Sequence, residues 1–128
     1  MNITLLTIGK CKNKGLLSVC ADYQKRLTPF WPTEVVELAD KSGDIIAEKA
    51  LIKKYLAKQK DNPTLIALDE RGKQHTSNSF ARTLQQFETQ NTRHLIIIIG
   101  GADGLHPEIK NQANLSLSLS AMTLPHML

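Results

Sequence analysis

The stretch LIIIIGGADG, residues 95–104, decides the fold of this sequence. Its first half is apolar at every position from Leu95 to Ile99, whereas a strand with one face in water alternates apolar and polar residues. The run therefore predicts a strand covered on both faces, which is typical of the centre of a parallel sheet. The second half, Gly100 to Gly104, predicts either a tight turn into a helix or a loop whose backbone a ligand can approach closely.

Strands and helices alternate along the rest of the chain. Short apolar or β-branched runs predict further strands at residues 3–8, 33–38, 64–69 and 115–119. Apolar residues at helical spacing predict helices at 16–27, at about 44–59 and after an N-cap at Ser77. The segment Glu70 to Lys73 is expected to be the turn that ends the third strand. This alternation predicts an α/β fold with a parallel sheet, helices on both faces and a single domain over 1–128.

The composition is that of a globular, mildly basic protein. Sixteen Lys and Arg residues against twelve Asp and Glu residues give a net charge of +4, which fits an RNA partner without requiring one. Two cysteines, Cys11 and Cys20, indicate no disulfide scaffold, and neither cysteines nor histidines have the spacing of metal ligands, so we expect no metal. We expect a cytoplasmic protein, because no signal peptide or membrane-length apolar run is evident.

Three predicted strands end in segments that could contact one ligand. They are Leu68-Asp69, Gly100 to Gly104, and Ser118 to Leu124. Ligands of open α/β sheets bind beyond the carboxyl ends of the strands, which makes this edge the candidate site. The glycine run alone does not decide between a turn and a binding loop. It is not a G-x-G-x-x-G fingerprint, and the chain has no G-x-x-x-x-G-K-[ST] loop.

Five segments together carry a resemblance to a known family. They are Gly9-Lys10, YQKRL at 23–27, ALD at 67–69, IIGGADG at 98–104 and LSLSAMTLPH at 117–126. In this order they resemble the ribosomal RNA large subunit methyltransferase H family, part of the SPOUT superfamily of knotted methyltransferases. The resemblance implies an α/β knot and a homodimer that uses S-adenosylmethionine to methylate N3 of a pseudouridine in large-subunit (23S) rRNA within the ribosome.

The resemblance also implies which residues bind the cofactor. Transferred position by position, they are Leu68, Gly100, Gly101, Leu119, Ser120, Ala121, Met122, Thr123 and Leu124. Backbone groups of Met122 and Leu124 would contact the adenine, and the side chains of Leu68 and Leu119 would pack on its two faces. The resemblance assigns no catalytic residue to this chain.

Family members continue past the Leu-Pro-His segment with a helix that completes the knot and a tail that contacts the substrate, whereas this sequence ends at Leu128. We therefore expect an incomplete knot, uncovered apolar surface over 115–124, weak binding of S-adenosylmethionine and no methylation of ribosomes. Two alternatives stay open. One is a shortened, non-catalytic paralogue that binds cofactor or RNA, and the other is a generic α/β nucleotide-binding module.

Basic residues cluster between the first strand and the first helix. Lys10, Lys12 and Lys14, with Lys25 and Arg26, are candidates for contact with rRNA phosphates. A solvated loop and helix face is the alternative interpretation of the same residues. The lysines at 53, 54, 58 and 60 are more typical of such a solvated face.

Overall fold

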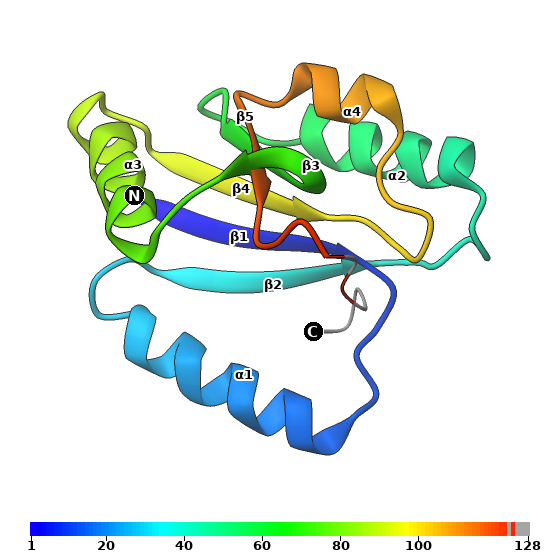
Figure 1. Cartoon of the computed structure of the whole chain (residues 1–128), viewed down its shortest axis with the longest axis horizontal. Coiled ribbons are helices and arrows are strands. Elements are labelled where there is room, and N and C mark those ends of the chain that lie inside the picture. Colours follow the sequence, from blue (N-terminus) through cyan, green and yellow to red (C-terminus); the bar gives the residue numbers. More distant parts are fainter. Residues whose placement is uncertain (123, 125–128) are drawn as a thin grey trace.

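The computed structural model describes residues 1–122 and 124, and in this part of the chain five strands form one parallel sheet (Figure 1). The strands are β1 (Asn2–Ile8), β2 (Thr33–Leu38), β3 (Thr64–Gln74), β4 (His94–Ile99) and β5 (Leu115–Ser118). The helices are α1 (Lys14–Leu27), α2 (Ile45–Ala57), α3 (Ser77–Thr89) and α4 (Pro107–Gln112). The strand order is β2-β1-β4-β3-β5, and every pair is parallel, so the predicted α/β class is confirmed.

Strand β4 lies at the centre of this sheet, between β1 and β3, as its apolar sequence predicts. Its alternate side chains enter two separate cores. Ile96 and Ile98 belong to one core, together with Ile52 of α2 and Ile109 of α4. Leu95 belongs to the other, which α3 covers with three partly buried side chains, Phe80, Leu84 and Phe87. Helices thus cover both faces of the central strand, which explains why it carries no polar residue after His94.

Side-chain caps fix where the helices begin. Asp44 accepts hydrogen bonds from two backbone N–H groups and starts α2. Thr76, and not the predicted Ser77, caps α3, because Thr76 has the extended backbone that a cap needs and its Oγ1 accepts from the N–H of Ser79 at 3.0 Å. The sequence interpretation missed α4, whose six residues are too few to show a helical period.

The prediction that a turn at Glu70 to Lys73 ends the third strand is wrong. Strand β3 continues to Gln74. Its pairing with β5 shifts register between Leu68 and Lys73, so that Leu117 of β5 pairs with both residues. Glycine at position 72 lets the backbones of β3 and β5 approach closely, since a Cβ there would lie 2.7 Å from the carbonyl carbon of Ser116. The residues between the two paired segments form a bulge at the sheet edge.

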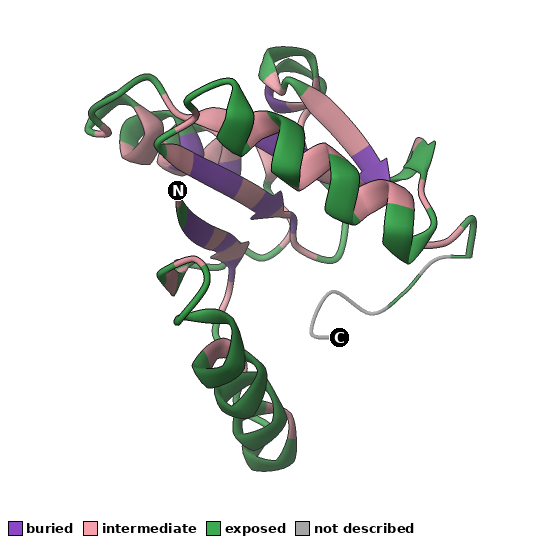
Figure 2. Ribbon diagram, turned by 90° about the vertical axis from the view of Figure 1, so that its left-hand side faces the viewer, coloured by how far each residue is buried: buried purple, intermediate pink, exposed green. Residues whose placement is uncertain are grey.

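Helix α1 stands apart from this compact body (Figure 2). None of its residues is buried, and Leu17 is 45% exposed. A hydrogen bond of 2.8 Å from Nε2 of Gln24 to the carbonyl oxygen of Thr33 connects it to β2. The amphipathic pattern of α1 is therefore not matched by burial. Within residues 1–122 and 124, no helix is long and apolar enough to cross a membrane.

Candidate functional site

A cavity of about 460 Å³ lies where the bulge of β3 meets the ends of β4 and β5. Its walls come from three segments distant in sequence, together with Lys110 of α4. The segments are residues 68–71, residues 99–105, and five residues of β5 and the chain after it: Leu117, Leu119, Ser120, Met122 and Leu124. The three strand-end segments singled out in the sequence therefore lie side by side. The volume falls within the range of about 300–1,000 Å³ that small-molecule sites occupy.

Most of the residues implied by the resemblance line this cavity. They are Leu68, Gly100, Gly101, Leu119, Ser120, Met122 and Leu124. Ala121 is exposed and is not among the lining residues, and Thr123 lies outside the described residues. The sequence interpretation included Asp69 but missed Glu70 and Arg71, because it treated them as a turn leading away from the sheet. It missed Lys110 because it missed α4.

The glycine loop is shaped by its own packing. The N–H of Gly104 donates to the carbonyl oxygen of Gly101 at 3.0 Å, which closes a tight turn, and Gly104 has a φ of +78°. A Cβ on Gly100 would lie 2.8 Å from the carbonyl carbon of Gly104. Glycine at these positions is thus required by the fold of the loop itself, and the turn and the cavity wall are the same structure.

Two carboxylates lie at the contact between this loop and the beginning of α2. Glu48 is 4% exposed, and its Oε1 would lie 3.3 Å from a Cβ added at Gly101. On the other side, a Cβ added at Gly43 would overlap Oδ2 of Asp103. A larger residue at Gly43 or Gly101 would therefore require the facing carboxylate to shift. The loop and the beginning of α2 are thus closely packed.

Charges at the rim of the cavity nearly balance. Nζ of Lys110 lies 3.3 Å from Oδ2 of Asp69, and both side chains are partly shielded from water. Arg71, Glu70 and Asp103 complete the charged lining. Three acidic and two basic residues do not favour a polyanion such as a triphosphate. They suit a ligand that carries both positive and negative groups.

The wall formed by the chain after β5 is apolar and ordered by hydrogen bonds. Leu119 is 71% exposed and Met122 is 73% exposed, although both line the cavity. Oγ of Ser118 lies 3.1 Å from the carbonyl oxygen of Glu70 and 2.8 Å from that of Ser120, and the N–H of Met122 donates to Oγ of Ser120. Ser118 thereby connects this wall to the bulge of β3. Such exposed apolar side chains could pack against the flat face of a ligand.

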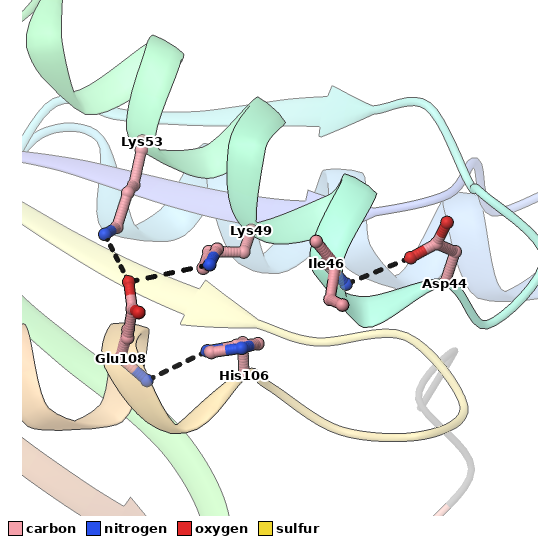
Figure 3. A network of polar contacts seen from close by, with 6 residues as sticks. All are labelled: Asp44, Ile46, Lys49, Lys53, His106 and Glu108. Atoms are coloured by element: carbon pink, nitrogen blue, oxygen red, sulfur yellow. Dashed lines mark hydrogen bonds and ion pairs between the residues drawn. The ribbon is translucent and has the colours of Figure 1, made fainter.

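A polar network sets the position of α4 and thus of Lys110 (Figure 3). The carboxylate of Glu108 lies 2.6 Å from Nζ of Lys53 and 3.6 Å from Nζ of Lys49, and the N–H of Glu108 donates to Nδ1 of His106. The hydrogen bond from Lys53, followed by the charge of Lys49, lowers the pKa of the Glu108 carboxyl. The network ties α4 to α2 on the same face of the sheet.

A comparison with protein families agrees with this arrangement. The family model described as "Predicted SPOUT methyltransferase" matches residues 1–128. The chain belongs to the SPOUT methyltransferase family. SPOUT methyltransferases generally use S-adenosylmethionine, a molecule with a flat adenine, an amino group, a carboxylate and a sulfonium. The cavity of this SPOUT methyltransferase fits such a group, because apolar walls from Leu68 and Leu119 lie beside the backbone of the glycine loop and a rim of mixed charge.

Proposed function

We propose that this SPOUT methyltransferase binds S-adenosylmethionine in the cavity of β3, β4 and β5 and methylates N3 of a pseudouridine in large-subunit rRNA, as a homodimer in the cytoplasm. One observation carries the cofactor part. One cavity is lined by residues that are far apart in sequence: Leu68, the Gly100–Gly101 pair, and Leu119, Ser120, Met122 and Leu124.

Each wall would contribute a different contact. The side chains of Leu68 and Leu119 would pack on the two faces of the adenine, and backbone groups near Met122 and Leu124 would hold its edge. The mixed charges of Asp69, Glu70, Arg71, Asp103 and Lys110 at the rim would meet the amino and carboxylate groups of the cofactor. When bound, the cofactor supplies an electrophilic methyl group on its sulfonium. The chain contributes orientation and shields the reacting atoms from water.

The substrate part rests on the sequence resemblance and on the chemistry of the nucleotide. N3 of a pseudouridine carries an imide proton that must leave when the nitrogen gains a methyl group. A site that holds this nitrogen in line with the methyl group would supply much of the rate by positioning alone. The net charge of +4 supports an RNA substrate.

Calorimetry with S-adenosylmethionine and S-adenosylhomocysteine tests the cofactor site. We expect Leu119→Ser to weaken binding roughly five- to tenfold, because one apolar contact of about 1–1.5 kcal/mol is lost. The matched control is Leu17→Ser on α1, which replaces another exposed leucine far from the cavity and should bind as the wild type does. Equal effects of the two substitutions would exclude this cavity as the cofactor site.

Methyl transfer is measured with tritiated S-adenosylmethionine and large ribosomal subunits that carry either pseudouridine or uridine at the target. Label on the pseudouridine form alone would support the full proposal. Cofactor binding without transfer to either form would support the cofactor site and contradict the proposed methylation of large-subunit rRNA. Label on both forms equally would contradict the proposed pseudouridine specificity.

A further inference from the structure

The net charge of the chain is concentrated in one segment, residues 10–27. This segment contains five of the sixteen basic residues, Lys10, Lys12, Lys14, Lys25 and Arg26, and one of the twelve acidic residues, Asp22, so it carries +4. The remaining eleven basic and eleven acidic residues cancel. The whole positive excess of +4 therefore belongs to the β1–α1 loop and to α1.

This charged segment begins beside the cavity. Thr7 at the end of β1 pairs with Ile99, the residue before the glycine loop, and a Cβ on Gly101 would lie 3.4 Å from Cγ2 of Ile8. The chain then passes through Gly9 into the lysine-rich loop. Helix α1 begins away from the sheet and runs back for about 21 Å, given its 14 residues and a rise of about 1.5 Å per residue, toward the beginning of β2, where Gln24 contacts Thr33 (Figure 1). The positive segment thus runs from the site edge of the sheet along α1 to the opposite edge, where β2 begins.

The segment is also accessible along its length. No residue of α1 is buried, and all five basic side chains belong to exposed residues. Lys14 and Lys25 are three turns apart and share the polar side of the helix, opposite Leu16, Cys20 and Tyr23. Arg26 lies beside both the exposed Asp22 at 3.3 Å and the ring of Tyr23 at 6.0 Å from its centre. The lysines are therefore the more available charges.

The lysines of α2 differ in their surroundings. Lys49 and Lys53 lie against the carboxylate of Glu108, and the chain outside residues 10–27 has no net charge. A surface whose positive charges are compensated attracts a polyanion less than one whose charges are not. This pairing with Glu108 distinguishes Lys49 and Lys53 of α2 from the lysines of residues 10–27.

From this segregation we infer that residues 10–27 form an RNA-docking surface, which binds the phosphate backbone and leads the RNA toward the cavity. The inference rests on the proposed function for the identity of the polyanion. Phosphate contacts of this kind position an RNA without reading its sequence. The surface gives affinity and direction, while the cavity edge selects the nucleotide.

The test is binding of a fluorescein-labelled RNA hairpin, followed by anisotropy over a range of salt concentrations. The variant K12Q/K14Q/K25Q is compared with K54Q/K58Q/K60Q, which removes the same charge from exposed positions on and after α2. We expect the first variant to bind at least about tenfold more weakly. The slope of the logarithm of the binding constant against the logarithm of the salt concentration should be shallower by about two to three. The second should stay within about twofold of the wild type.

Two further measurements make the result specific. Calorimetry with S-adenosylmethionine should give the same affinity for both variants, so that loss of RNA binding is distinguished from failure of the cofactor site. Sedimentation without RNA should show the same mass for both. Equal weakening by the two triple variants would overturn the inference, as would no weakening by either. A change of oligomeric state confined to K12Q/K14Q/K25Q would also overturn it and assign the segment to contact with a second copy.

Discussion

Helices α1 and α2 have nearly the same length, 14 and 13 residues, but opposite relations to the sheet. Helix α2 buries Ile52 and Glu48 and supports the glycine loop through Glu48 and the preceding Gly43. Helix α1 has the clearer amphipathic pattern and buries nothing. The difference follows from position, since α2 and α4 cover the centre of the sheet, whereas α1 joins β1 to the edge strand β2. In this protein one helix contributes stability and the other contributes charge.

The largest expected effect comes from comparing the loss of a buried side chain of α2 with the loss of an exposed one of α1. Ile52→Ala should lower the free energy of unfolding by about 2–5 kcal/mol, because the side chain is 1% exposed and a cavity would remain. Leu17→Ala on α1 should cost no more than about 0.5 kcal/mol. Urea denaturation of both variants provides the measurement. Similar losses would mean that α1 is packed in solution.

A second contrast concerns glycine. Gly100→Ala should cost about 1–3 kcal/mol and reduce the affinity for S-adenosylmethionine, because the new Cβ meets backbone atoms of Gly104. Gly15→Ala in α1 meets the flexible side chain of Asn13 at 3.3 Å and should change stability by no more than about 1 kcal/mol. Urea denaturation and calorimetry on each variant measure both quantities. A smaller loss of unfolding free energy for Gly100→Ala than for Gly15→Ala would contradict this explanation.

The smallest effect is a dependence on pH. The pKa of Glu108 lies below its ordinary value of 4.5, so its charge stabilises the fold above pH 4.5, and the contribution disappears as the pH falls through the lowered pKa. Glu108→Gln should therefore lower the urea midpoint slightly at pH 7 and leave it unchanged below that pKa. Asp22→Asn removes the exposed ion pair of α1 and should leave the midpoint unchanged at pH 7. A difference between wild type and Glu108→Gln that persists in acid would contradict this explanation.

Much of this arrangement could be predicted from apolar patterns. The run Leu95 to Ile99 gave the central strand, and the parallel sheet then placed the ends of its strands on one edge, where Leu68 and Gly100 meet. What could not be predicted depends on contacts between distant segments. Gly72 reads as a turn residue until Ser116 is placed against it. Glu48 likewise has the pattern of an ordinary helical glutamate, since nothing local indicates that it packs against Gly101.

The double pairing of Leu117 has a consequence for how the cavity responds to a ligand. This residue of β5 pairs with Leu68 and with Lys73, so the bulge between them is enclosed by an edge strand of four residues. A ligand that contacts the bulge and the wall after β5 stabilises the pairing of that strand by mass action, and the strand in turn raises the affinity for the ligand. Ligand binding in the cavity and the pairing of β5 are thus thermodynamically coupled. Slower amide exchange in β5 on addition of the ligand would report this coupling.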